Sequence, residues 1–107
     1  MRTFYGSTFI DEEKLRLEGK KNPIKLEYYK IINEDEFIKK ERAKYGVKIV
    51  KTEYMDKKIK IEEKEFQYIS NNEDYVNKLL NLLKRNIVTP ISMEDIIKDL
   101  FPSAIFM

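Results

Sequence analysis

The chain has 107 residues, which is the size of one ordinary domain. Hydrophobic residues make up 42% of the sequence and charged residues 37%, so one core can form beneath a strongly solvated surface. Cysteine, histidine and tryptophan are absent, which excludes disulfide scaffolds, thiolate metal sites, cysteine nucleophiles and imidazole chemistry.

The charges of the chain nearly cancel. The 21 Lys and Arg residues and the 19 Asp and Glu residues leave a net charge of +2. The isoelectric point of about 8.6 lies below the value of about 9 that is typical of nucleic-acid-binding domains. No apolar run approaches the roughly 20 residues of a membrane span, and residues 1–10 lack the apolar centre of a signal peptide. We therefore expect a cytoplasmic protein with no membrane contact.

The first part of the chain gives weak structural signals. Residues 1–10 mix aromatic and small polar side chains, which predicts either a short strand or an ordered arm. Residues 11–23 are mostly charged and contain Gly19 and Pro23, a pattern typical of a solvated connector. Residues 1–23 are therefore treated as an N-terminal arm.

A β-meander is predicted for residues 24–69. Alternating apolar residues over 24–32 indicate a half-buried strand, whose apolar positions are Ile24, Leu26, Tyr28 and Ile32. Residues 37–42 favour either an extended hairpin arm or a helical turn.

From Tyr45 the alternation returns on both sides of a polar turn at residues 55–58, which predicts a hairpin. Ile61 and Phe66 have opposite parity. A β-bulge around Glu62-Glu63 is expected to return both side chains to one face.

Two helices are predicted over residues 72–101. Asn71 or Asn72 provides an N-cap for a helix at 73–86, and Asn86 follows its last turn as the C′ residue. Thr89-Pro90 breaks this helix. Ser92 is expected to open a second helix at 92–101, with Asp95 completing a weak capping box. Residues 102–107 form a short apolar tail.

These elements predict a single α+β domain over residues 1–107, with an antiparallel β-meander of three to four strands packed against two C-terminal helices. The expected core residues are Ile24, Leu26, Val47, Ile49, Ile61, Phe66, Val76, Leu79, Leu80, Leu83, Ile96, Ile97 and Leu100.

Two segments resemble a known family. Lys44-Tyr45-Gly46-Val47 precedes the alternating strand, and residues 86–100 (NIVTPISMEDIIKDL) carry a Thr-Pro followed by an acidic helix. With the leucine-rich helix between them, they resemble short bacterial proteins that are known only as a domain of unknown function. The resemblance covers roughly residues 24–101 and implies no activity, substrate, cofactor or catalytic residue.

Catalytic and metal sites have little support in the sequence. Asp95 and Asp99 are four residues apart on a predicted helix, a spacing that can hold a hard cation such as Mg²⁺. A solvated acidic helix face explains the same pattern and is favoured. Ser92 already serves as a helix cap, and the three glycines form no phosphate-binding loop. We therefore predict no catalytic residue, no cofactor and no metal.

Nucleic-acid binding is the alternative function. Basic and aromatic side chains on a sheet can hold single strands by stacking and charge. The candidate contacts are Lys48, Lys51, Lys57, Lys58, Lys60 and Tyr54. A solvated sheet face with edge-protecting lysines explains the same residues and is favoured. A winged-helix-like arrangement is also considered, although residues 92–101 would then bring a net charge of −2 toward phosphates.

Protein binding is the leading hypothesis. The apolar segments at Phe4-Tyr5, Phe9-Ile10 and residues 105–107 either pack back onto the core or form a surface for a partner or for self-association. A small domain without catalytic equipment commonly acts by binding. The sequence thus predicts a noncatalytic protein-interaction or regulatory protein of the bacterial cytoplasm, with a protein partner.

Overall fold

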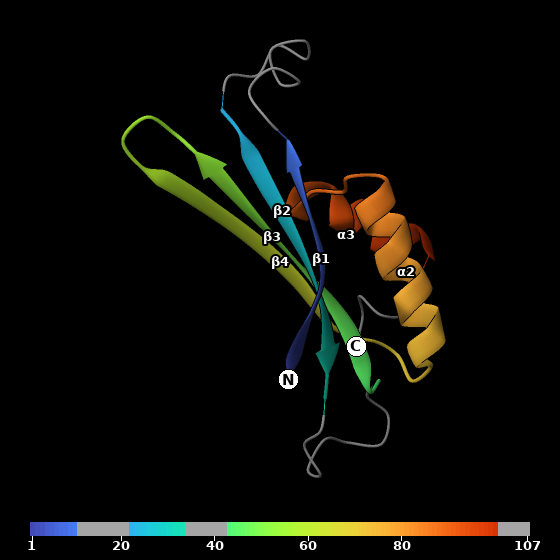
Figure 1. The fold of residues 1–107 in the computed structure, drawn as a ribbon. Coiled ribbons are helices and arrows are strands. Elements are labelled where there is room, and N and C mark those ends of the chain that lie inside the picture. The colour runs from blue at the N-terminus through green and yellow to red at the C-terminus, as the bar shows by residue number, and fades with distance from the viewer. Residues whose placement is uncertain (11–21, 34–42, 101–107) are drawn as a thin grey trace.

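The computed structural model describes residues 1–10, 22–33 and 43–100. In this part of the chain four antiparallel strands form one sheet in the order β1-β2-β3-β4, and two helices follow (Figure 1). The elements are β1 (Arg2–Ile10), β2 (Ile24–Ile32), β3 (Tyr45–Tyr54), β4 (Ile59–Ser70), α2 (Glu73–Arg85) and α3 (Pro90–Leu100). This arrangement confirms the predicted α+β class, the meander and the two C-terminal helices.

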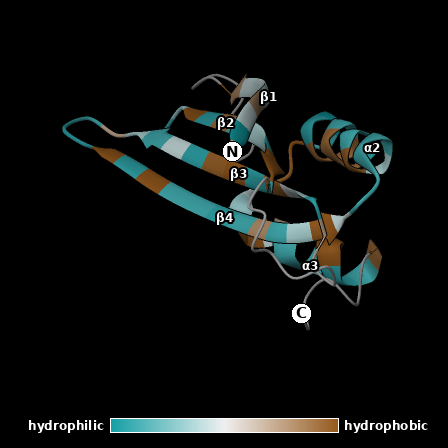
Figure 2. Ribbon diagram, turned by 90° about the horizontal axis from the view of Figure 1, so that it is seen from below, coloured by the Kyte–Doolittle hydropathy of each residue, from teal (hydrophilic) through white to brown (hydrophobic). Residues whose placement is uncertain are grey.

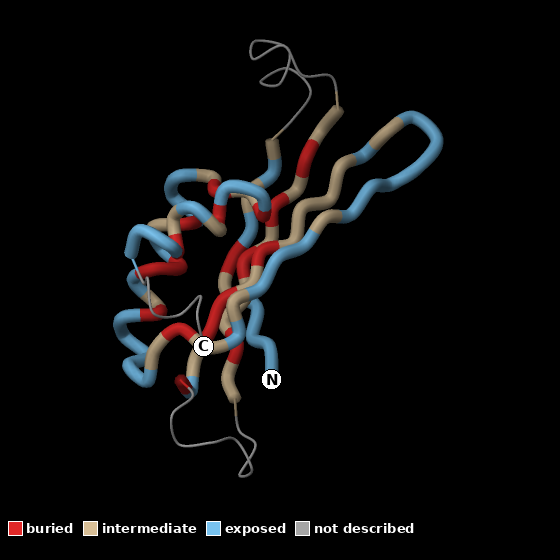
Figure 3. Tube along the Cα trace, turned by 180° about the vertical axis from the view of Figure 1, so that it is seen from behind, coloured by how far each residue is buried: buried red, intermediate tan, exposed pale blue. Residues whose placement is uncertain are grey.

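Both helices lie against the same face of the sheet, so the fold has two layers (Figure 1, Figure 3). α2 contacts all four strands, whereas α3 contacts β3 and β4. Between the layers lies one cluster of buried side chains: Ile24, Leu26, Tyr28, Val47, Ile49, Ile69, Val76, Leu79, Leu80, Leu83, Val88, Met93 and Ile97. The hairpin of β3 and β4 extends beyond the helices, and its tip is exposed (Figure 3).

The N-terminal ten residues form an edge strand instead of a separate arm. β1 pairs with β2, and the register shifts between Phe4 and Gly6, which leaves Tyr5 as the extra residue of a β-bulge. Tyr5 and Ile10 pack against the core, while Phe4 and Phe9 lie on the other face and are exposed. The expected packing onto the core therefore holds for Tyr5 and Ile10, whereas Phe4 and Phe9 remain at the surface.

The predicted bulge at Glu62-Glu63 is wrong, because β3 and β4 pair regularly there. The register instead shifts between Tyr45 and Val47, at the start of β3. Tyr45 pairs with Ser70 and Val47 with Phe66, so the extra residues of β4 lie opposite Gly46. A Cβ on Gly46 would lie 2.2 Å from the carbonyl oxygen of Phe66, so this close approach of two backbones requires glycine.

The position of this bulge changes the core. Because β4 is regular at residues 62–63, Ile61 faces away from the helices and is 62% exposed, so its assignment to the core is wrong. Leu100 is also wrong as a core residue: at the last residue of α3 it lies beyond the buried stripe and is 47% exposed. Phe66 and Ile96 are partly buried against the core, and all other predicted core residues are buried.

Asn72 caps α2 as predicted, because its side chain accepts a hydrogen bond from the Tyr75 backbone N–H at 3.1 Å. The predicted C-terminal geometry is displaced by one residue. Asn86 is the C-cap itself, with a φ of −92°, and Ile87 takes the left-handed φ of 52°.

The backbone after α2 explains how Ile87 is held in a conformation that β-branched residues rarely adopt. Its N–H donates to the Lys84 carbonyl at 3.1 Å, and the Val88 N–H donates to the Leu83 carbonyl at 2.9 Å. These are the two bonds of a Schellman motif. They turn Val88 directly into the core, and the burial of Val88 offsets the strain at Ile87.

α3 begins at Pro90, two residues before the predicted start at Ser92. The Thr89 N–H donates to Ser92 Oγ at 3.2 Å, and the Met93 N–H donates to the Thr89 carbonyl at 3.0 Å. Thr89 is therefore the capping residue and Pro90 takes the first helical position, where its missing N–H has no cost. Ser92 lies in the first turn of α3, and its hydroxyl oxygen accepts the hydrogen bond from the Thr89 backbone.

Tyr28 joins the two layers at the centre of the core. Its ring is fully buried, and its hydroxyl donates to the Val88 carbonyl at 3.0 Å in the connection between the helices. The buried phenol thus pairs with a backbone carbonyl, as buried polar groups in folded proteins generally do.

Three predicted segments lie wholly or largely outside the described residues. They are the connector at 11–23, of which the structure describes only 22 and 23, the ambiguous segment at 37–42, and the tail at 102–107.

The packing of α2 on the sheet predicts large losses of stability for truncations of its buried leucines. Leu80→Ala and Leu83→Ala are each expected to lower the free energy of unfolding by about 2–5 kcal/mol, because both side chains are fully buried. Ile91→Ala is the matched control, since Ile91 is 75% exposed, and is expected to change it by less than about 0.5 kcal/mol. Urea unfolding measures the free energy of unfolding of all three variants. Losses below about 0.5 kcal/mol for both leucine variants would contradict the packing of α2 on the sheet.

The buried phenol predicts a loss of stability at alkaline pH. Burial raises the pKa of Tyr28 from 10.0 to about 12. The folded chain keeps this proton over a pH range in which the unfolded chain loses it, so the free energy of unfolding falls as the pH rises from about 10 to about 12. Tyr28→Phe is expected to cost about 1 kcal/mol at neutral pH and to flatten this alkaline slope. Urea unfolding at several pH values measures this slope for the wild type and for Tyr28→Phe. If the free energy of unfolding falls equally with pH in both proteins, Tyr28 is not the group responsible.

Candidate functional site

The helices leave one face of the sheet uncovered by any described element (Figure 1, Figure 2). Successive strand residues alternate between the two faces. Because Leu26, Tyr28 and Ile49 are buried against the helices, their neighbours along the strands point to the uncovered side, which is called the open face below.

Four large apolar side chains gather where the open face meets the β3–β4 hairpin. Tyr54 and Ile59 are directly opposite each other in the register, and Ile61 is opposite Thr52, two residues farther along each strand. Phe9 reaches this group from β1, with its ring centroid 6.3 Å from that of Tyr54. Phe9, Tyr54, Ile59 and Ile61 form the open-face cluster, and their exposed fractions are 60%, 37%, 60% and 62%.

A second aromatic contact lies farther along the same face. The rings of Phe4 and Tyr29 meet edge to face, with centroids 5.7 Å apart. The Tyr29 hydroxyl donates to a Glu27 carboxylate oxygen at 2.9 Å. Burial, together with the hydrogen bond and the negative charge of Glu27, raises the pKa of Tyr29. The phenol therefore stays a neutral donor, and Glu27 is held against the face.

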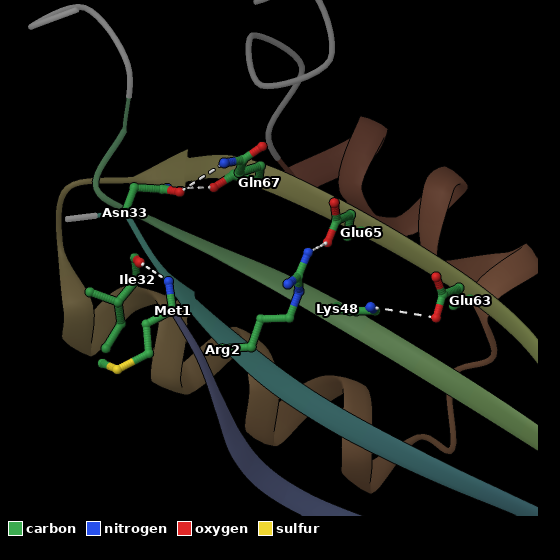
Figure 4. A network of polar contacts seen from close by, with 8 residues as sticks. All are labelled: Met1, Arg2, Ile32, Asn33, Lys48, Glu63, Glu65 and Gln67. Atoms are coloured by element: carbon green, nitrogen blue, oxygen red, sulfur yellow. Dashed lines mark hydrogen bonds and ion pairs between the residues drawn. The ribbon is translucent and has the colours of Figure 1, made fainter. Parts of the chain in front are cut away.

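The charged side chains of the open face pair with one another (Figure 4). Arg2 reaches across from β1 to a Glu65 carboxylate oxygen at 3.0 Å, and the Lys48 ammonium lies 3.4 Å from Glu63. The strand register places three cations and three carboxylates on this face: Arg2, Lys25, Lys48, Glu27, Glu63 and Glu65. Over these residues the face carries no net charge.

Hydrogen bonds fix the end of the sheet beside these ion pairs. The Asn33 side chain donates to the Gln67 carbonyl at 2.9 Å and accepts from the Gln67 side chain at 3.1 Å (Figure 4). The Met1 amino group donates to the Ile32 carbonyl at 2.7 Å, which extends the pairing of β1 with β2.

The predicted nucleic-acid contacts do not come together. Lys48 lies on the open face but is paired with a carboxylate, whereas Lys51 and Lys60 belong to the opposite face by register. Lys60 is also paired, with Glu62 at 3.2 Å. The turn at the hairpin tip carries Lys57 and Lys58. Of the predicted residues only Tyr54 joins the open-face cluster.

The sequence analysis had already named Phe9 in a candidate surface segment, but it missed Ile59 and Ile61 as surface residues. Their signal was the unbroken alternation of the hairpin, in which Tyr54 and Ile59 flank a short turn and Ile61 shares their parity. The expectation of a bulge at residues 62–63 concealed it.

Shallow hollows also lie on the described surface, among them the following. One of about 280 Å³ is lined by Glu62, Glu63, Lys64, Pro90, Ile91 and Glu94. One of about 190 Å³ lies between the helices at Tyr75, Lys78, Leu79, Leu82 and Leu100. One of about 470 Å³ lies between β1 and α2 at Thr8, Asn81, Lys84 and Arg85.

The described ranges also bear on metal sites and membrane spans. No group of three or more acidic side chains there is arranged to hold a metal ion. Both Asp95 and Asp99 are exposed on α3. Likewise, no described helix is both long and apolar enough to cross a bilayer.

Comparison with known proteins identifies a family but no activity. The profile of a family of unknown function (DUF6514) matches residues 8–103, and the chain belongs to this family. This confirms the resemblance to a domain of unknown function and extends it beyond residues 24–101. No curated protein and no solved structure matches the chain significantly.

If the open-face cluster does not serve folding, its side chains can be replaced without loss of stability. Ile59→Thr and Ile61→Thr keep a β-branched side chain and remove apolar surface that is already exposed. Each is expected to change the free energy of unfolding by less than about 0.5 kcal/mol. Urea unfolding measures the change, with Leu80→Ala as the destabilised reference. A loss above about 2 kcal/mol would instead assign these residues to folding.

Proposed function

We propose that this chain is a noncatalytic protein-interaction or regulatory protein of the bacterial cytoplasm, and that the open face of its sheet binds a partner protein. The observation that carries the proposal is the open-face cluster: four large apolar side chains lie together on a face that no described element covers. Apolar groups clustered on a surface are typical of binding sites, whereas single exposed apolar residues are ordinary.

The composition of the cluster suits a binding site. Phe9 and Tyr54 present rings that bury much area for few rotatable bonds, and Ile59 and Ile61 flank them. Aromatic side chains at the centre of an interface commonly supply most of its binding energy. The surrounding polar side chains provide the rim that excludes water.

The charges of the open face indicate the chemistry of the partner. Because Arg2 and Lys48 already pair with Glu65 and Glu63, the face offers no excess charge of either sign. A strongly charged partner would have to break these pairs without compensation. The partner surface is therefore apolar and without net charge, and it lies flat against the sheet.

The same balance counts against nucleic acid as the ligand of this face. Phosphate binding requires cations that are free to neutralise it, and the predicted lysines are divided between two faces and the hairpin tip. Nucleic acid is accordingly the alternative outcome of the experiment.

Three tagged proteins test the proposal: the wild type, Ile61→Lys and the control Ile91→Lys. Both variants add the same charge at a highly exposed isoleucine, but only Ile61 lies on the open face. Each is incubated with native cell extract with and without nuclease, and any captured protein is then purified and titrated. We expect one partner to bind the wild type and Ile91→Lys equally, and Ile61→Lys at least about tenfold more weakly.

Hydrogen exchange of the purified complex locates the contact. The proposal expects slower exchange in the β3–β4 hairpin and in β1, and unchanged exchange in α3. A partner that is equally sensitive to both substitutions would contradict the open face as the binding site. Capture that disappears with nuclease would replace the proposal by the nucleic-acid alternative.

A further inference from the structure

Among the described residues, four side chains that can each donate a hydrogen bond to an anion line the hollow between β1 and the last turns of α2. Its volume is about 470 Å³, and its lining residues are Thr8, Asn81, Lys84 and Arg85. A hydroxyl, an amide, an ammonium and a guanidinium therefore meet at one place, with no carboxylate among them. This site lies on the helix-covered side of β1 and is separate from the open face.

The bulge in β1 orients one of these donors. Tyr5 is the extra residue of the bulge, and its hydroxyl donates to the Oδ1 atom of Asn81. This bond uses one acceptor position of Oδ1 and fixes the orientation of the amide, whose Nδ2 group can then donate to a ligand.

Gly6 positions the second donor. The side chain of Lys84 lies over Gly6, where a Cβ would come within 3.1 Å of its Cδ, Cε and Nζ atoms. Contacts of that length are tighter than ordinary packing allows. The missing side chain at Gly6 therefore lets the Lys84 ammonium lie close to β1, beside the hollow.

Lys84 and Arg85 have no carboxylate partner among the described residues. Other cations of the described chain do have one, namely Arg2, Lys30, Lys48, Lys60 and Lys98. Basic residues in a last turn also stabilise a helix through its dipole. That role accounts for the charges of Lys84 and Arg85. It does not account for the glycine beneath Lys84 or for the tyrosine that turns Asn81.

We propose that this hollow binds a phosphate-type oxyanion, either as free phosphate or as the phosphoryl group of a larger ligand. Donors that approach from a strand and a helix suit a tetrahedral anion with several acceptor oxygens. Arg85 supplies a planar fork for two of these oxygens and Lys84 a point charge. The hollow is open to solvent, so a group that carries a phosphoryl can extend outward from it.

Inorganic phosphate is the first probe. The ¹⁵N-labelled full chain is titrated with sodium phosphate at constant ionic strength, and amide shifts in α2 and β1 are followed by NMR. Sodium chloride and acetate serve as matched anions, and phenyl phosphate separates a free-phosphate site from one for phosphorylated ligands. We expect saturable shifts around Thr8 and Lys84 with both phosphates and none with chloride.

The variants are Lys84→Gln and Arg85→Gln, with Lys78→Gln as the control. Lys78 is an exposed lysine of the same helix and lies outside this hollow. Loss of a hydrogen bond to a charged group is expected to weaken phosphate binding at least about tenfold in each variant, with Lys78→Gln unchanged. Gly6→Ala, which crowds Lys84, is expected to weaken binding while every charge is kept.

Two results would overturn the proposal. Shifts that do not saturate, or that chloride reproduces, would show only screening of the helix end. Equal weakening by Lys78→Gln and Lys84→Gln would show a nonspecific effect of net charge. If Gly6→Ala does not fold, the two glutamine variants still decide. Ile61→Lys is expected to bind phosphate normally, so this proposal and the proposed function fail independently.

Discussion

The structure depends on one constraint: all the helical cover in the described chain lies on a single face of a four-stranded sheet. Each strand must therefore present apolar side chains to that face and tolerate water on the other. Tyr28 holds the cover in place, because its hydroxyl binds the Val88 carbonyl in the connection from which both helices extend. The open face is the direct consequence of this arrangement, and the open-face cluster lies exposed on it.

Local signals explain why most of the fold was predictable. Alternation at residues 24–32 and on both sides of the hairpin turn specifies strands, and Asn72 with the leucine spacing specifies α2. Predictions failed where the backbone departs from these rules. Ile87 takes a φ that β-branched residues rarely adopt, and two backbone hydrogen bonds and the burial of Val88 hold it there. At Pro90 the proline was read as the end of one helix, although it equally begins another.

The candidate site was less predictable, because it depends on which face the helices cover. Ile61 has the same hydrophobicity as a core isoleucine, and only the regular pairing at residues 62–63 turns it outward. The lysines of the hairpin looked like one basic group in the sequence, but alternation divides Lys48 from Lys51 and Lys60. No local pattern reports the long-range approach of Arg2 to Glu65 from the opposite edge of the sheet.

The bulge at Tyr5 builds both proposed sites at once. Phe4 and Phe9 are five residues apart and would face opposite sides of a regular strand. The extra residue brings both rings to the open face, where they meet Tyr29 and Tyr54. The same irregularity directs Tyr5 to the helices, where it orients Asn81 beside the hollow. A one-residue change in the pairing of β1 with β2 would exchange its two faces. Thus a single local feature of an edge strand links an apolar surface on one side of the sheet to a cationic hollow on the other.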